Sequence, residues 1–254
     1  MFKPNKVIPF AFDKKEAVDI FLRYIKKKKF LPRDYFTADN AEKISGIYYP
    51  FWVTDADTKA KLETLAHKVR KWRAGNYRYT EISDFFVKRS GDIHFEDITT
   101  SAISEDDKRM LEGILPYPMD AYRDFQMPYL LGYAAKKRDI ERDSLSAEVR
   151  DRMHFYAKTI LERTVTGYSS VDSPTVGINI KSSHWEYSLL PIWILTYRKK
   201  GRKKDKVYTY AMNGHTGKIY GELPISIPKL ALLFGAVAGI LAVLFTLCGR
   251  FLLI

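Results

Sequence analysis

The residue types that could do chemistry are few in this sequence and lie far apart. No two of the five histidines stand at the spacing of a zinc-binding motif; they are His67, His94, His154, His184 and His215. The single cysteine, Cys248, lies in a long apolar run, so this chain alone can form neither a disulfide nor a cysteine-ligated zinc site. The pattern predicts no cofactor and no metal centre in this chain.

Two short segments superficially resemble catalytic or phosphate-binding motifs. The segment NGHTGK, residues 213–218, lacks the first glycine of a Walker A loop, because that position is Met212, and Ile219 stands where Ser or Thr is required. Asn and Gly tolerate positive φ, so this segment predicts a tight turn between strands. Asp55 and Asp57 follow an apolar stretch and are interpreted as a solvated turn. With no GxSxG or GxGxxG motif, the sequence predicts a protein that is not an enzyme.

The strongest charged feature is the segment RKKGRKKDK, in which seven of nine residues are basic: Arg198, Lys199, Lys200, Arg202, Lys203, Lys204 and Lys206. It falls between two expected strands, so we expect an exposed loop. Such a loop can simply add solubility, or it can contact an anionic membrane, where each basic residue contributes about 1 kcal/mol. Nucleic-acid binding is a third interpretation, since tyrosines lie nearby.

The C-terminus contains an uncharged run from Leu230 to Cys248, nineteen residues long. As a helix it would measure about 28 Å, which is close to the hydrocarbon thickness of a bilayer. We therefore predict a transmembrane helix over 229–254, with lipid-facing or helix-contacting residues Leu230, Phe234, Gly235, Gly239, Leu244 and Cys248. Gly235 and Gly239 form a GxxxG pattern, which can bring two such helices together in a homodimer.

The charge and the N-terminus suggest how the rest of the chain is placed. The formal net charge is +12, and this favours anionic partners such as phospholipid headgroups, nucleic acid or acidic proteins. The N-terminus lacks the apolar stretch of a signal peptide. We therefore expect a single-pass protein of the cell membrane, with residues 1–228 in the cytoplasm as one region or as two subdomains of about 1–140 and 141–228.

The remaining pattern predicts an α+β fold, with antiparallel meander elements and several packing helices. A helix should begin after Asp13, because Glu16 completes a capping box. Residues 46–53 predict a strand in which Pro50 marks an edge or a bulge. Residues 60–73 fit a strand that turns at 75–76 into a second strand, and a helix over 60–73 is the alternative.

Further along the chain, a turn, a helix and a hairpin are expected. Residues 90–92, Ser-Gly-Asp, are typical of a turn. A helix capped by Ser144 or Ser146 should bury Val149, Met153, Tyr156 and Ile160, which recur at helical spacing. Residues 185–197 and 207–212 predict a hairpin, with the basic segment between its strands.

Several of these segments together resemble one known family. They are VIPF at 7–10, GIYYPFWVTDAD at 46–57, LPYP at 115–118, YLLGY at 129–133, and the closing stretch from Leu190 to Pro224. In this order they are similar to the zinc-ribbon-containing (TFIIB-type zinc ribbon) single-pass membrane proteins of Firmicutes, and the resemblance covers essentially the whole chain. It implies a membrane context rather than a reaction.

The chain departs from that family at its beginning, where the family usually has two CxxC pairs. Either the ribbon is lost here or it is encoded upstream of Met1, and no zinc ligand can be carried over. Some members of the family look like adaptors that work with phage-shock-type and flotillin-like proteins in envelope stress. The resemblance therefore implies a non-enzymatic membrane adaptor, and the alternative is a membrane-tethered nucleic-acid-binding protein.

Overall fold

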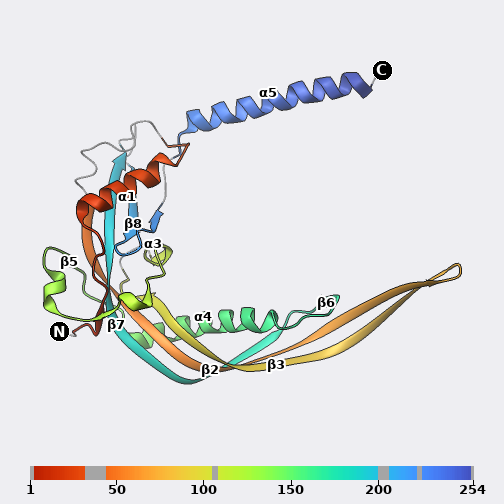
Figure 1. Ribbon diagram of the computed structural model, residues 1–254, viewed down its shortest axis with the longest axis horizontal. Helices are drawn as coiled ribbons and strands as arrows, with labels where there is room; N and C mark the ends of the chain where they lie inside the picture. The colour runs from red at the N-terminus through yellow and green to blue at the C-terminus, as the bar shows by residue number, and fades with distance from the viewer. Residues whose placement is uncertain (1–2, 32–43, 105–107, 200–205, 222–224, 253–254) are drawn as a thin grey trace.

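The computed structural model describes residues 3–31, 44–104, 108–199, 206–221 and 225–252, and has an α+β fold (Figure 1). Its four described α-helices are α1 (Lys14–Lys26), α3 (Lys108–Gly113), α4 (Arg142–Glu162) and α5 (Ile227–Leu252). Two 3-10 helices cover Met119–Ala121 and Met127–Leu130. The strands are β1 (Lys6–Val7), β2 (Ile44–Ala74), β3 (Tyr77–Ser101), β4 (Arg123–Asp124), β5 (Ala134–Ala135), β6 (Ser170–Val171), β7 (Thr175–Lys199), β8 (Lys206–Asn213) and β9 (Ile219–Gly221).

One nine-stranded sheet organises the molecule. Its main path runs β3-β2-β7-β1-β4, while β5 and β6 pair with β2, and β8 joins β7 to β9. Most pairs are antiparallel, and β1 with β7 and β5 with β2 are the parallel ones. Because β2 and β7 pair from Ile44↔Leu195 to Glu63↔Thr175, strands from residues 1–140 and from residues 141–228 belong to the same sheet.

Both prolines of the central strands lie where a backbone N–H is not needed. Pro50 is inside β2 rather than at an edge, and its carbonyl accepts a hydrogen bond from the Ala102 N–H at 3.0 Å. On that side of β2 the pairing with β5 has ended and the pairing with β3 has not begun. Pro191 lies in the corresponding gap of β7, between β1 and β8. Each missing donor therefore falls between two neighbouring strands.

β2 and β3 form a long hairpin that continues far beyond the rest of the sheet (Figure 1). Residues 60–73 are part of β2, so the predicted strand is confirmed and the helical alternative is wrong. The two-residue turn at Gly75 and Asn76 is also confirmed, and Gly75 has the positive φ of +59° that favours glycine. The turn expected at 90–92 is wrong: Gly91 lies within β3 opposite Ala60, because pairing with β2 overrides the local turn preference.

Helix α4 covers one face of the sheet where β2, β3 and β7 lie side by side. Its buried stripe packs on small and apolar strand residues, and the cluster consists of Ala56, Ala60, Leu62, Phe95, Ile98, Val149, Met153, Ala157 and Leu161. The helix begins at Arg142, without a side-chain cap, so the predicted cap by Ser144 or Ser146 is wrong. The buried stripe confirms Val149 and Met153 but not Tyr156 and Ile160, which are 47% and 45% exposed.

Helix α1 covers a different part of the sheet, near the β7–β8 hairpin. The expected capping box is present, since the Asp13 carboxylate accepts from the Glu16 N–H at 2.8 Å and the Glu16 carboxylate accepts from the Asp13 N–H at 3.0 Å. Phe21 packs on Tyr210 of β8 and on the strand residues around it. Before this helix only Lys6 and Val7 pair, so β1 is two residues long.

Candidate interaction surfaces

Helix α5 projects from the body and has no protein packed around it (Figure 1). Residues Ile227–Thr246 have a mean hydropathy of 2.2 and none of this stretch is buried. The helix is long and apolar enough to cross a membrane. Its beginning is joined to the body by two hydrogen bonds, from the Ser226 N–H to the Phe30 carbonyl and from Lys229 Nζ to the Leu31 carbonyl, both 2.7 Å.

The predicted contact residues of this segment all lie on α5. Leu230, Phe234 and Leu244 are 41%, 77% and 51% exposed, and Cys248 is also exposed. Gly235 and Gly239 are one turn apart, and a Cβ placed on either would meet nothing within 4 Å. The glycine face is therefore open, which is the geometry that close helix pairing requires.

The basic segment connects β7 to β8 as expected, but only its ends fall in the described residues. Arg198 and Lys199 belong to β7 and Lys206 to β8, where Lys199 pairs with Lys206, so these three are strand rather than loop residues. Lys200, Arg202, Lys203 and Lys204 lie outside the described residues. The ends of β7 and β8 are at the same end of the body from which α5 leaves (Figure 1).

The segment NGHTGK is a structural turn, as predicted. The buried Asn213 side chain accepts hydrogen bonds from the N–H groups of His215 and Thr216, both at 2.9 Å. Its amide donates to the Ile114 carbonyl at 3.0 Å, and Lys218 donates to the Leu115 carbonyl. These contacts hold the chain around residue 115 against the sheet and use the polar groups that a phosphate site would need.

The acidic pair Asp55 and Asp57 is divided between separate contacts. Asp57 accepts from His94 at 2.7 Å and from Ser182 at 2.8 Å, and the hydrogen bond from His94 lowers the pKa of the Asp57 carboxyl. The Asp55 carboxylate instead accepts from the Asp97 N–H at 2.9 Å. Within the described residues no group of three or more His, Cys, Asp or Glu side chains is placed to hold a metal ion.

Sequence reasoning missed Asp97, which lies in a β-bulge of β3 and has the positive φ of 57°. Burial raises the pKa of its carboxyl, which accepts hydrogen bonds from Thr99 at 3.0 Å and Tyr122 at 3.2 Å. Beside it, Arg152 donates to the Thr99 carbonyl and to the Glu112 and Glu148 carboxylates. These polar groups satisfy one another, so the cluster joins α3 and α4 to β3. A cavity of about 370 Å³ lies beside it and is lined in part by Asp97, Thr99 and Arg152.

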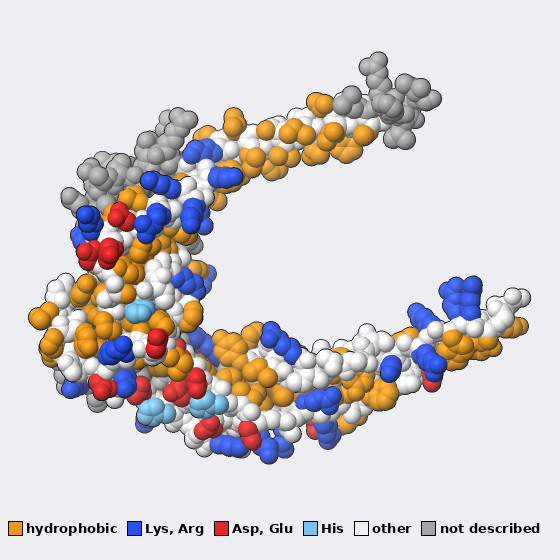
Figure 2. Space-filling view, viewed as in Figure 1, with side chains coloured by type: hydrophobic (Ala, Val, Ile, Leu, Met, Phe, Trp, Pro, Cys, Tyr) orange, Lys and Arg blue, Asp and Glu red, His pale blue; other side chains and the backbone are white. Residues whose placement is uncertain are grey.

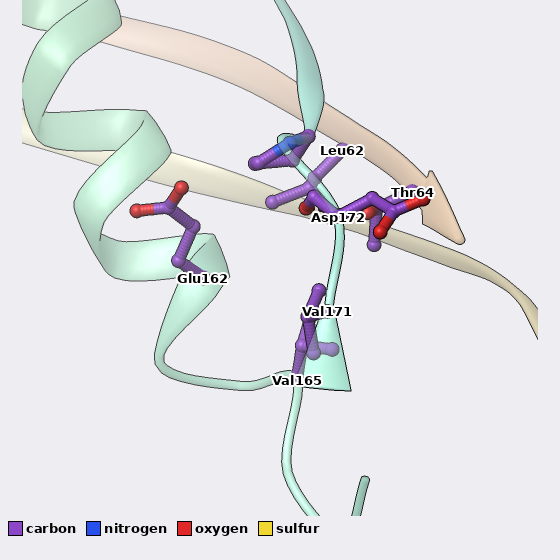
Figure 3. Close-up of a pocket in the computed structure, with 7 residues that line it drawn as sticks. Leu62, Thr64, Glu162, Val165, Val171 and Asp172 are labelled. Carbon is purple, nitrogen blue, oxygen red and sulfur yellow. Dashed lines mark hydrogen bonds between the residues drawn. The ribbon is translucent and has the colours of Figure 1, made fainter. Parts of the chain in front are cut away.

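Two further cavities flank α4. The smaller one, of about 180 Å³, lies between the end of α4 and the hairpin and is lined by Leu62, Thr64, Glu162, Val165, Val171, Asp172 and Pro174 (Figure 3). It is smaller than typical ligand sites, which exceed about 300 Å³. The second, of about 550 Å³, is an open groove beside Phe155 and Tyr156. With Ile160, these side chains give α4 an exposed apolar face.

A second exposed surface belongs to the end of the β2–β3 hairpin, here called the arm and defined as residues 64–87. Pairing with β7 ends at Glu63, and β6 pairs only with Ala66 and His67. The last described hydrogen bond from the body reaches the Val69 N–H, which donates to Ser169 Oγ at 2.9 Å. Beyond that point the arm is a two-stranded ribbon.

The two faces of the arm differ. Cross-strand pairing places four apolar residues on one face: Leu65 beside Phe86 and Val69 beside Ile82, with exposures of 47%, 59%, 37% and 65%. On the other face Trp72 stacks on Tyr79, with ring centroids 5.5 Å apart and an interplanar angle of 12°. The Arg70 guanidinium lies 5.7 Å from the Trp72 ring centroid, a cation–π arrangement.

Positive charge is concentrated at the end of the arm, where Figure 2 shows Lys and Arg side chains gathered. Residues 68–80 include no acidic residue and five basic ones: Lys68, Arg70, Lys71, Arg73 and Arg78. Sequence reasoning missed this surface because the basic residues are interleaved with aromatic and apolar residues instead of forming one run.

Comparison with known proteins finds one informative relative. The chain is 31% identical over 236 residues to the uncharacterized protein YdjG of Bacillus subtilis (strain 168), a match that covers 93% of this chain and 68% of that protein. The chain belongs to the YdjG family. No family model matches the sequence. No solved structure matches it either.

The match to YdjG includes part of the arm. Of 254 residues, 236 are matched, which leaves 18 outside the match, fewer than the 24 residues from 64 to 87.

Proposed function

We propose that this protein is a non-enzymatic, single-pass membrane adaptor that recruits cytoplasmic partners to the cell membrane. The observation that carries the proposal is α5: a long apolar helix, with none of its apolar stretch buried, attached to a folded body that has separate exposed surfaces. An apolar helix of this length is costly to leave in water, and a bilayer is the solvent that suits it.

The body and helix are arranged consistently with this role. The β7–β8 hairpin, which carries the predicted basic segment, ends on the side of the body from which α5 leaves (Figure 1). Basic residues beside a membrane helix favour the anionic cytoplasmic leaflet. The open glycine face at Gly235 and Gly239 supports pairing of two copies inside the bilayer.

The resemblance to zinc-ribbon membrane proteins supplies the class of partner. On that basis the adaptor works in envelope stress with phage-shock-type or flotillin-like proteins. The exposed face of α4, with Phe155 and Tyr156 in the groove and Ile160 next to it, is a suitable surface for a protein partner, because a few large side chains supply most of the binding energy at interfaces.

The anchor is tested by extraction of bacterial membranes at alkaline pH. The full chain should stay in the membrane pellet, whereas a chain shortened before Lys229 should move to the supernatant. Protease added to intact spheroplasts should leave the body uncut. Release of the full chain by alkali, or cleavage of the body in intact spheroplasts, would contradict the anchor or its orientation.

Partner recruitment is tested by affinity capture of the full chain from detergent extract, followed by mass spectrometry. Membrane-stress proteins should be captured with the native chain and reduced with the F155S/I160S variant. R150Q on the same helix is the matched control, because Arg150 is exposed outside the groove. Capture that is equal in all three, or that contains no stress protein, would contradict this role.

Nucleic-acid binding is a second candidate, favoured by the stacked Trp72 and Tyr79 with Arg70 beside them. Binding of single-stranded DNA or RNA to the full chain in detergent should then weaken steeply with salt, with a log–log slope set by the number of phosphate contacts. Absence of such binding at low salt leaves the adaptor as the proposal.

A further inference from the structure

Strand β3 has an outer edge to which no described strand is paired. It ends the main path of the sheet, and β5, β6 and β8 join the sheet at β2 or β7 instead. Within the described residues, no group outside the β2–β3 hairpin forms a hydrogen bond with the backbone of Arg89–Phe95. An edge of this kind presents a row of backbone donors and acceptors with which another extended chain can pair.

The flank of α4 that faces this edge is apolar. Arg152 donates to the Thr99 carbonyl at 3.0 Å, and the Tyr156 ring lies 6.5 Å from the Phe95 ring, so this flank of the helix points toward the outer edge of β3. Ile160 is one turn beyond Tyr156 and therefore lies on the same flank. Both side chains are about half exposed. A chain paired with β3 would lie against them and bury their apolar surface.

The space between α4 and the outer edge of β3 is open, and we call it the edge groove. The cavities of about 370 and 550 Å³ share Leu115, Arg152 and Tyr156, so they adjoin at one end of it. Farther along, a Cβ placed on Gly91 would meet nothing within 4 Å, on the face where its partner Ala60 packs under α4. The stretch Arg89–Phe95 is about 23 Å long at 3.3 Å per residue, which suits a strand of ordinary length.

The opposite edge of the sheet differs from the edge groove. There β7 is outermost before β1 pairs with it at Ser188. The flank of α4 toward β7 carries His154 and Lys158 instead of large apolar side chains, and His154 Nε2 lies 2.9 Å from the Val176 carbonyl. Only the β3 side therefore combines unpaired backbone groups with exposed apolar side chains above them.

The charges at the end of the edge groove indicate what kind of chain fits it. Its two cavities are lined by one basic residue, Arg152, and by five acidic ones: Glu96, Asp97, Glu112, Glu148 and Asp151. The chain as a whole has a formal net charge of +12, so this acidic surface is a local exception. A basic partner is complementary to it, and an acidic partner is disfavoured by like-charge repulsion.

We propose that a basic, extended segment of a protein partner binds in the edge groove as an added strand of the sheet. Its backbone pairs with Arg89–Phe95, and its apolar side chains pack on Tyr156 and Ile160. Its Lys or Arg side chains lie near the acidic end of the groove. This inference names the chemistry of the partner at the α4 face, and it rests on the proposed function only in that a protein partner binds there.

The test titrates the full chain in detergent into a fluorescent octapeptide of alternating valine and lysine, with binding measured by anisotropy. Two matched peptides carry N-methyl groups, one on the four valines and the other on the four lysines. A strand added to β3 pairs through only one of its own edges, so one methylated peptide should bind at least about tenfold more weakly than the other. The alternating valine–glutamate peptide should bind at least about tenfold more weakly than the lysine peptide.

Two glycine variants of the chain then show which edge the peptide uses. Gly91→Val places a side chain in the open space between β3 and α4 and should weaken binding of the lysine peptide by about tenfold or more, because the added strand loses backbone hydrogen bonds. Gly177→Val in β7 is the matched control, since a Cβ there also meets nothing within 4 Å, and it should leave binding within about twofold. Thermal unfolding of both variants checks that they fold.

Three outcomes would overturn the added strand. They are equal binding of the two methylated peptides, equal effects of the two glycine variants, and a dimer in detergent that Gly91→Val converts to a monomer. The first indicates adhesion through side chains alone, the second places the peptide elsewhere, and the third assigns the groove to a second copy of this chain. The peptide assay contains no membrane-stress protein, so its failure leaves affinity capture as the test of the adaptor. Failure of capture alone contradicts the adaptor and leaves the edge groove to be decided by the peptides.

Discussion

The two halves of the β2–β3 hairpin share a strand pattern but not an environment. In the half nearer the body, residues 54–63 and 88–98, the face toward α4 is buried, with Ala60 and Leu62 fully enclosed. On the same face of the arm, Trp72, Tyr79 and Phe85 are between 42% and 44% exposed. The difference comes from the neighbours: α4 ends at Glu162 and β7 begins at Thr175, so the cover stops while β2 and β3 continue. Alternation along a strand fixes which side chains share a face, and other elements decide whether that face is buried.

The halves also differ in how their charges are used. Asp57 with His94 and Asp92 with Lys181 are paired across strands on the solvent face, opposite the packed one, which keeps the body locally neutral. The arm ends in basic residues that have no ionic partner in the described structure. One half of the hairpin is therefore organised for stability and the other for contact with something outside the chain.

The largest expected effect comes from truncating one leucine in each half. Leu62→Ala should lower the free energy of unfolding by about 2–5 kcal/mol, because it leaves a cavity in the cluster under α4. Leu65→Ala, three residues away on the same strand, should change it by no more than about 0.5 kcal/mol. Denaturant titration of the two variants in mild detergent measures both. Similar losses of unfolding free energy in the two variants would show that Leu65 is packed as tightly as Leu62.

The next effect concerns the ionic cluster that fixes α4 over the body half. Arg152→Met should lower the free energy of unfolding by about 1–3 kcal/mol, since it leaves the half-buried Glu112 carboxylate and the Thr99 carbonyl without this donor and leaves Glu148 with Lys108 alone. Arg150→Met on the exposed side of α4 is the control and should have little effect. The same denaturant titration compares the two variants. Equal stability would show that the Arg152 cluster contributes no more than a surface ion pair.

Much of the fold could be predicted because its signals are local. The capping box at Asp13, the turn at Gly75 and Asn76, the Asn213 turn and the apolar α5 each depend on residues a few positions apart. The turn expected at 90–92 failed for the opposite reason. Ser90, Gly91 and Asp92 favour a turn locally, but their partners Lys61, Ala60 and Lys59 lie 29 to 33 positions earlier in the chain.

The candidate surfaces were harder to predict than the elements. On α4, spacing alone placed Tyr156 and Ile160 on the buried face, whereas the strands cover only the stripe of Leu145, Val149, Met153, Ala157 and Leu161. The basic run at 198–206 stood out because its charges are contiguous. The arm's charges alternate with apolar and aromatic residues, so their concentration becomes visible only when the hairpin brings Arg73 beside Arg78 and Trp72 beside Tyr79.

A smaller effect is expected from the stacked aromatic pair at the end of the arm. A double-mutant cycle on Trp72→Ala and Tyr79→Ala should give a coupling of about 0.5–1 kcal/mol in the free energy of unfolding, measured in detergent without anionic lipid. The control cycle pairs Trp72→Ala with Thr80→Ala, whose side chain is on the opposite face, and should give no coupling. Coupling in both cycles would indicate a general loosening of the ribbon instead of a specific stack.

The smallest effect lies at the boundary between the two halves, where His67 joins the arm to the body. Its ring contacts Asp84 of β3 at 2.6 Å and Asp172, next to β6, at 3.3 Å. The hydrogen bond with Asp84, and then that with Asp172, raises the pKa of His67. The folded protein therefore binds the proton more tightly than the unfolded chain. The stabilisation is complete below the ordinary histidine pKa of about 6.5 and is lost as pH rises through the raised pKa.

The stability of this junction can be measured by hydrogen exchange of two backbone amides that donate to β2 beside His67. The Ser169 N–H donates to the His67 carbonyl at 2.8 Å and the Asp172 N–H to the Leu65 carbonyl at 2.9 Å. After correction for intrinsic exchange, both should be better protected at pH 6 than at pH 8, and His67→Gln should remove that difference. His94→Gln, which removes the similar pair with Asp57 in the body half, should leave it unchanged. Because His67 and its partners contact water, the change is modest, and equal protection at both pH values in the native chain would mean that the arm is held by backbone pairing alone.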